Sequence, residues 1–103
     1  MVVEYATWEV DTSHPEAYFA WMLGLGDECR AEKGRLAYDY RVDRRDPYRA
    51  SLFQAWETHE AFEAHLVFPA HQQMTSAGHE WAVRNLVIRR WSAASGYHER
   101  RRP

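Results

Sequence analysis

The sequence has one cysteine, no long apolar run and no excess of positive charge among its 103 residues. Because Cys29 has no second cysteine to pair with, no internal disulfide can form, and this fits a reducing cytoplasm. No segment approaches the roughly 20 apolar residues that cross a bilayer, and the N-terminal MVVEYATWEV lacks the basic start of a signal peptide. A formal net charge of −2 argues against a general nucleic-acid binder. We therefore expect a cytoplasmic, single-domain protein with no membrane or nucleic-acid partner.

Aromatic residues, by contrast, are abundant. They make up 15% of the chain and include five tryptophans. A domain of this length has room for only one modest core, which cannot easily enclose so many large rings. We therefore expect some of the rings to line a cavity or an interface.

Apolar residues alternate in four segments, and this alternation predicts four strands. We expect the strands over residues 2–10, 36–42, 50–57 and 83–91. A helix is predicted after the first strand, where Ser13 and Glu16 have the spacing of a capping box and Gly34 is placed for a C-terminal cap. Its apolar stripe is formed by Tyr18, Met22, Leu25 and Cys29.

A second helical region follows the third predicted strand. Thr58 offers a side-chain oxygen as N-cap, Pro69 ends or kinks the helix, and Gly78 is the expected stop. Residues 93–103 are small, polar and then basic, and they predict a mobile C-terminal tail outside a domain of residues 1–92.

The predicted element order is β-α-β-β-α-β. With right-handed crossovers it gives an α+β, ferredoxin-like fold: a four-stranded antiparallel sheet with the helices on one face. Neither face of the predicted strands is polar enough to meet water. We therefore expect two copies to pack sheet to sheet as a homodimer, closing a barrel-like α+β dimer.

Several short motifs resemble the antibiotic biosynthesis monooxygenase (ABM) family of dimeric α+β barrel proteins. The motifs are G-x-L-x-Y at Gly34, Leu36 and Tyr38, Q-x-W-E at Gln54, Trp56 and Glu57, E-A-x-x-A-H-L from Glu60 to Leu66, and P-x-H at Pro69 and His71. The resemblance covers roughly residues 2–91. It implies a monooxygenase that needs no cofactor and uses O₂ to oxidise a small aromatic, phenolic substrate of the polyketide or quinol type to a quinone.

Such a reaction needs a base to form the electron-rich anion, a dry aromatic pocket and a hydrogen-bond donor for the intermediates. The predicted bases are His65 and His71. The predicted substrate-binding residues are Trp56, Tyr38, Tyr40, Gln54 and Asn85.

Other interpretations of these residues stay open. His65 shares a helical stripe with apolar residues and also suits a core histidine, and His71 also suits a cap for the turn that follows. His59, His65 and His71 are six residues apart, a spacing that points helical side chains in different directions, so we expect no metal site. The alternatives to a monooxygenase are an isomerase, cyclase or decarboxylase on the same scaffold, and a protein that binds an aromatic ligand without chemistry.

Overall fold

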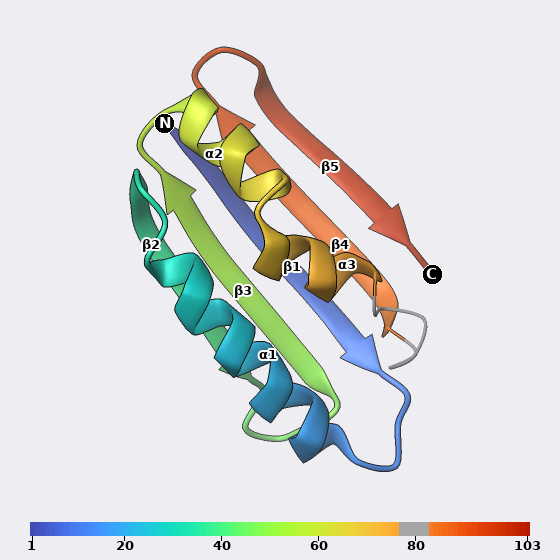
Figure 1. Cartoon of the computed structure of the whole chain (residues 1–103). Coiled ribbons are helices and arrows are strands. Elements are labelled where there is room, and N and C mark those ends of the chain that lie inside the picture. The colour runs from blue at the N-terminus through green and yellow to red at the C-terminus, as the bar shows by residue number, and fades with distance from the viewer. Residues whose placement is uncertain (77–82) are drawn as a thin grey trace.

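The chain folds as an antiparallel sheet with its helices on one face (Figure 1). The computed structural model describes residues 1–76 and 83–103. Its elements are β1 (Val2–Val10), α1 (Pro15–Arg30), β2 (Arg35–Val42), β3 (Arg49–Trp56), α2 (His59–Leu66), α3 (Pro69–Ser76), β4 (Val83–Ser92) and β5 (Gly96–Arg102). The strand order is β2-β3-β1-β4-β5, and every neighbouring pair is antiparallel. The ferredoxin-like α+β prediction is thus confirmed, with a fifth strand added at the edge.

The fifth strand corrects the prediction of a mobile tail over residues 93–103. After a turn at Gly96, whose φ is +72°, β5 pairs with β4 from Ser92 to Leu86. Glu99 accepts hydrogen bonds from Arg89 on β4 at 3.1 Å and from Arg101 on β5 at 2.9 Å. Backbone pairing and these ion pairs hold a strand whose polar composition gave no sign of a buried face.

Helix α1 has the predicted apolar stripe, since Tyr18, Met22, Leu25 and Cys29 are all buried. The predicted capping box is wrong: His14 is the N-cap, no side chain caps the helix, and Pro15 opens it. The helix also ends at Arg30, before Gly34. Gly34 instead adopts a left-handed φ of +84° in the turn into β2. A Cβ atom built there would lie 2.6 Å from the Cβ of Ala61, so the turn fits closely against α2.

The second helical region behaves as predicted at its start and at its break. The Oγ1 of Thr58 accepts a hydrogen bond from the backbone N–H of Ala61 at 3.1 Å and so caps α2. The helix ends at Leu66, and Pro69 begins α3 because a proline at the first helical position loses no hydrogen bond. The predicted stop at Gly78 lies outside the described residues. None of the helices described has the length and apolar character that a bilayer-spanning helix requires.

The two faces of the sheet differ in what covers them. On β1, Val2, Glu4, Ala6 and Trp8 are buried on the face that carries the helices, as their alternation predicted. None of the described helices covers the opposite face (Figure 1). It exposes four large rings, at Tyr5, Phe53, Trp91 and Tyr97, each with 39 to 54% of its surface accessible.

Candidate functional site

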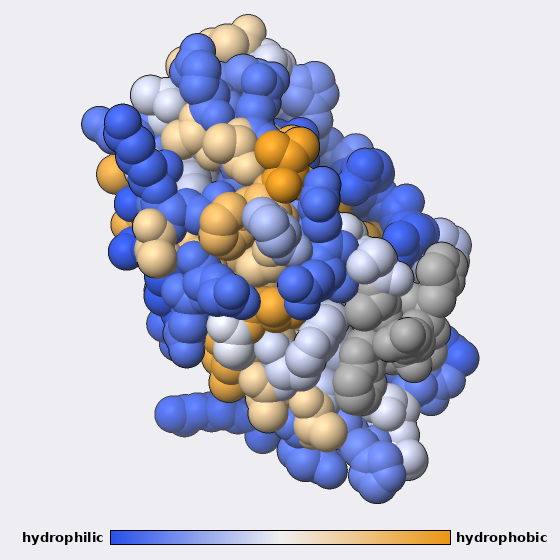
Figure 2. All heavy atoms as spheres, in the orientation of Figure 1, coloured by the Kyte–Doolittle hydropathy of each residue, from blue (hydrophilic) through white to orange (hydrophobic). Residues whose placement is uncertain are grey.

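A cavity of about 300 Å³ lies between the helices and the sheet. Its apolar lining includes Trp8, Tyr18, Met22, Leu66, Leu86 and Ile88. Figure 2 shows that the helix side of the molecule is largely hydrophilic, with apolar atoms gathered where the helices meet. The cavity is therefore an apolar space beneath a polar surface, which suits a small aromatic ligand.

Three of the predicted site residues line this cavity: Tyr38, Gln54 and His71. The position of His71 follows from Pro69, which begins α3 two residues earlier and directs that helix over the sheet. The hydroxyl of Tyr38 reaches the Sδ atom of Met74 on the same helix at 3.7 Å. Burial raises the pKa of Tyr38 well above its usual value, so its hydroxyl stays protonated and serves as a donor.

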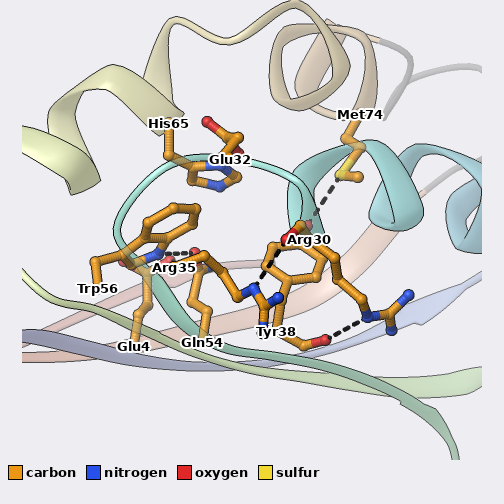
Figure 3. Close-up of polar contacts among 9 residues, drawn as sticks. All are labelled: Glu4, Arg30, Glu32, Arg35, Tyr38, Gln54, Trp56, His65 and Met74. Atoms are coloured by element: carbon orange, nitrogen blue, oxygen red, sulfur yellow. Dashed lines mark hydrogen bonds and ion pairs between the residues drawn. The ribbon is translucent and has the colours of Figure 1, made fainter.

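His65 lies behind His71 and is fully buried. Its ring stacks on Trp56, with centroids 4.6 Å apart, and its centroid is 4.5 Å from that of His71. Its Nδ1 atom is 2.6 Å from a carboxylate oxygen of Glu32, which follows α1 (Figure 3). Its Nε2 atom is buried with no hydrogen-bond partner among the described residues.

Burial changes the protonation of these groups. It lowers the pKa of His65 to about 4, and burial together with the nearby His65 lowers the pKa of His71 to about 4. Burial raises the pKa of Glu32 to about 7. Both imidazoles are therefore neutral near neutral pH, and His71 presents an unprotonated ring nitrogen to its surroundings.

A chain of hydrogen bonds runs across the sheet below the cavity. The indole N–H of Trp56 donates to Gln54 at 2.8 Å, and the amide of Gln54 donates to Glu4 at 3.3 Å. Arg90 donates to the other carboxylate oxygen of Glu4 at 2.7 Å, and its guanidinium lies 4.6 Å from the ring centroid of Phe62. The chain fixes the amide of Gln54 at the cavity and neutralises the buried charge of Glu4.

The remaining predicted residues do not reach the cavity. Trp56 and His65 are buried behind its wall, and Tyr40 packs in the core with its ring centroid 5.5 Å from that of Trp8. Asn85 lies on the surface of β4, where its amide donates to Glu9 at 2.9 Å. Its φ of +51° belongs to a bulge between β1 and β4, and this turns it away from the predicted site. The structure thus places these four residues outside the cavity lining, and their roles, His65 as a base and the other three in substrate binding, stay predictions.

Cys29, Glu32 and His65 come together although they are far apart in the sequence. Their ligand atoms all lie within 4.8 Å of one another, and these residue types can bind a metal ion. The Nδ1 atom of His65 is, however, already bonded to Glu32, and burial raises the pKa of the Cys29 thiol to about 11. The three residues therefore suit a hydrogen-bonded cluster that holds His65 in place.

The sequence analysis missed the charged residues of the site. The sequence did contain a sign that Glu4 is buried, because Glu4 lies between apolar residues on one face of β1. Arg90 continues the face of Leu86 and Ile88, so strand alternation also pointed to it. Glu32 follows the end of α1 in a polar stretch, and nothing in the sequence indicated its role in the site. Arg100 and Arg102 line the cavity from β5, the strand that was predicted to be a tail.

The fold and the site together define the class: a ferredoxin-like α+β protein with a partly open cavity, lined in part by aromatic side chains, between its helices and its sheet. The model of the family described as "Antibiotic biosynthesis monooxygenase" matches residues 1–77. The chain belongs to this family, as its motifs predicted, and its general function is of the type that the family name describes.

Solved structures resemble the whole chain. A candidate antibiotic biosynthesis monooxygenase from Deinococcus radiodurans is 24% identical, with a TM-score of 0.80 over 90% of this chain and 92% of that one. A protein from Pseudomonas aeruginosa is 22% identical, with a TM-score of 0.76 over 99% of this chain and 93% of that one. A similarly described protein from Nitrosomonas europaea is 19% identical, with a TM-score of 0.79 over 90% and 98%. At these identities the likeness concerns the fold, and no curated protein matches the chain.

Proposed function

We propose that the protein is a cofactor-independent monooxygenase that oxidises a phenolic aromatic substrate of the anthrone or naphthol type to a quinone with O₂. The observation that carries the proposal is the position of a neutral histidine, His71, in an apolar cavity beside Tyr38 and Gln54. This combination offers the base, the donors and the exclusion of water that the reaction needs.

The size of the cavity supports a reaction without an organic cofactor. Ligand pockets hold roughly 300–1,000 Å³, and this cavity is at the lower end with about 300 Å³. This volume has room for one aromatic ring system and O₂.

The chemistry starts with a proton transfer. His71 removes a proton from the methylene carbon of an anthrone, and the resulting carbanion is delocalised as a phenolate-like enolate. The enolate gives one electron to O₂, and the radical and superoxide combine to form a peroxide anion on that carbon. Electron-rich rings make this first electron transfer favourable, and the apolar walls keep water away from the radical pair.

The second half of the reaction returns the protons. The protonated His71 gives its proton to the peroxide, and it then takes the second hydrogen of the same carbon as a proton while the O–O bond breaks. The departing hydroxide takes up that proton and leaves as water. One CH₂ group and one O₂ thus become one carbonyl group and one water, and His71 is neutral again.

Neighbouring residues support these steps without taking part in bond changes. Tyr38 and Gln54 donate hydrogen bonds to the enolate oxygen and stabilise its charge. His65 packs against His71 and is itself held by Glu32, so the pair positions the ring of the base. In the first proton transfer, the new enolate and the protonated His71 form an ion pair that offsets the low pKa of His71.

The proposal includes a homodimer. The uncovered face of the sheet exposes Tyr5, Phe53, Trp91 and Tyr97, and packing two such faces together would remove these rings from water. The cavity lies on the other side of the sheet and would stay accessible in each copy.

The test is the conversion of a hydroxyanthrone with and without O₂, using protein treated with a chelator and checked spectroscopically for the absence of flavin. The proposal predicts quinone formation and one O₂ consumed per quinone, and no conversion without O₂. Conversion that continues without O₂ would instead indicate an isomerase, cyclase or decarboxylase. Tight binding without conversion of any phenol in a panel would indicate a binding protein.

A further inference from the structure

The charge of the cavity differs in sign from the charge of the chain. The chain carries a formal net charge of −2. Among the residues that the structure describes, the charged side chains that line the cavity are Arg90, Arg100, Arg102 and Glu4, and their charges sum to +2 when His71 is neutral. A positive, largely apolar cavity favours a ligand that carries negative charge on an aromatic body.

Two of the three arginines supply this excess. Arg90 is paired with Glu4 at 2.7 Å, so their charges cancel. Arg100 and Arg102 have no carboxylate within 4 Å among the residues that the structure describes. Both are exposed, so their guanidinium groups are free to contact a ligand at the edge of the cavity.

The geometry of β5 places these two side chains together. They are two residues apart on a strand, so they project from the same face, about 7 Å apart along the strand. In the ladder they lie opposite Ile88 and Leu86 of β4, both of which also line the cavity. Figure 1 shows β5 at the edge of the sheet, and none of the described helices lies over it.

The arginine between them behaves differently. Arg101 projects from the opposite face of β5 and is paired with Glu99 at 2.9 Å. Arg89, on the same face, also pairs with Glu99 at 3.1 Å. On this ribbon Arg89 and Arg101, which face away from the cavity, both pair with Glu99, whereas Arg100 and Arg102 have no such carboxylate partner among the described residues.

We propose that the substrate is an aromatic carboxylate, and that Arg100 and Arg102 bind its carboxylate at the edge of the cavity while its ring lies beneath the helices. Guanidinium groups form charge-assisted, paired hydrogen bonds with carboxylates, and a small anion suits two side chains that share one face. The proposal rests on the proposed function in taking this cavity as the substrate site, and it makes both arginines specificity-determining residues.

The experiment measures binding without turnover. A hydroxynaphthoic acid and its uncharged amide are titrated under nitrogen into the full-length protein, with Trp8 in the cavity wall providing a fluorescence signal. The wild type should bind the acid about tenfold or more tightly than the amide. The double variant R100Q/R102Q should lose this preference and bind the amide as before, whereas R101Q, on the same strand, should keep it.

Each outcome separates the two proposals. Equal binding of acid and amide by the wild type, or equal loss of preference in R101Q, overturns the carboxylate proposal. So does a double variant that loses affinity for both ligands alike while its melting curve is unchanged. If the acid binds through the two arginines but no phenol is ever oxidised, the carboxylate site stands and the monooxygenase proposal fails. If neutral phenols are oxidised but the wild type binds the acid and the amide equally well, the monooxygenase proposal stands and the carboxylate proposal fails.

Discussion

A histidine kept neutral by its surroundings is the central feature of the site at the scale of single residues. His71 lies in the cavity wall, and its neighbour His65 is fully buried and bonded to Glu32. A buried imidazole resists protonation because the protein interior solvates its charge poorly. In the proposed mechanism His71 exchanges protons, and His65, which is bonded to Glu32, positions the ring of His71.

Replacing His71 by Gln should remove the base and keep most of the shape of the wall. We expect kcat for quinone formation to fall about 100-fold to 10,000-fold, as is typical for loss of a general base, with little change in KM. The control is His59→Gln on α2, because His59 is exposed and pairs with Glu63 at the surface. An H71Q variant that keeps more than half of the wild-type kcat would contradict this role.

Glu32→Gln tests whether Glu32 positions His65. The amide can still hydrogen-bond Nδ1, but it cannot carry the charge or share the proton. We expect a loss in kcat of about tenfold, smaller than for H71Q, and a change in its pH dependence near pH 7, where the Glu32 carboxyl ionises. A pH profile identical in shape to that of the wild type would show that Glu32 plays no such part.

The same groups predict how stability depends on pH. Burial lowers the folded-state pKa of His65 and His71 from 6.5 to about 4, so the unfolded chain binds more protons and their contribution to stability is lost as the pH falls from 6.5 through 4. Burial raises the pKa of Glu32 from 4.5 to about 7, so its contribution is lost as the pH rises from 4.5 through 7. Two histidines outweigh one glutamate, and the net effect below pH 6.5 is destabilisation by acid.

Urea unfolding of wild type and H71Q between pH 4 and pH 7 checks this sign. The wild-type free energy of unfolding should drop more steeply on acidification than that of H71Q, because the variant has one fewer buried group that must stay neutral. Parallel curves for the two proteins would mean that His71 titrates normally in the fold.

Residue types and strand alternation predicted part of the site. Tyr38, Gln54 and His71 line the cavity, and each of these positions follows from a place in a strand or after Pro69. Asn85 lies outside the cavity lining because a bulge shifts the register of β4, and alternation cannot locate a bulge. The pairing of Glu32 with His65 joins residues 33 positions apart, and this depends on how α1 and α2 pack.

At the scale of elements, the turn between α1 and β2 contacts both the helix layer and the sheet. Gly34 combines a left-handed φ with close contact to Ala61 at the start of α2. In addition, its carbonyl accepts a hydrogen bond from Glu57 at 2.7 Å, which joins the turn to the end of β3. One glycine thus sets the spacing between three elements near the site.

Gly34→Ala and Gly96→Ala form a matched pair for this interpretation. Both glycines have positive φ, but a Cβ at Gly96 meets nothing within 4 Å. We expect G96A to cost about 1 kcal/mol of stability from backbone strain alone, and G34A to cost about 2–4 kcal/mol from strain plus the clash. Equal losses for the two variants in urea unfolding would show that the contact with Ala61 is easily relieved.

The elements were largely predictable because local signals were strong. The stripe of α1, the cap at Thr58 and the break before Pro69 each express a property of a few neighbouring residues. The strand β5 was not predictable in this way, since its sequence is polar throughout and the strand forms by pairing with β4. That error concealed Arg100 and Arg102, two of the three arginines that line the cavity among the described residues.

At the scale of the whole molecule, the sheet face without a described helix exposes large aromatic side chains to water. Its four large rings come from four different strands but lie on one face, because Tyr5 pairs with Phe53 and Trp91 pairs with Tyr97. Exposed large rings gathered on one sheet face favour an interface with another molecule. The homodimer that we propose would cover this face.

Phe53→Glu tests the dimer, with Leu23→Glu as control. The two side chains are similarly exposed, at 39% and 42%, but Leu23 lies on α1 and Phe53 on the sheet face. Sedimentation analysis at micromolar concentration should show a dimer for wild type and L23E and a monomer for F53E, because a buried charge opposes packing of the two faces. A monomeric wild type would contradict the proposed dimer.

The most direct test of the account is the fate of isotopically labelled O₂ during conversion of a hydroxyanthrone by the wild type and by H71Q. The account predicts that the enzyme-formed quinone carries one labelled oxygen atom and that the other leaves in water, at a rate that H71Q reduces to near the uncatalysed background. A quinone oxygen that comes from water, or labelling at the same rate by H71Q, would contradict the claim that His71 in this cavity starts the reaction with O₂.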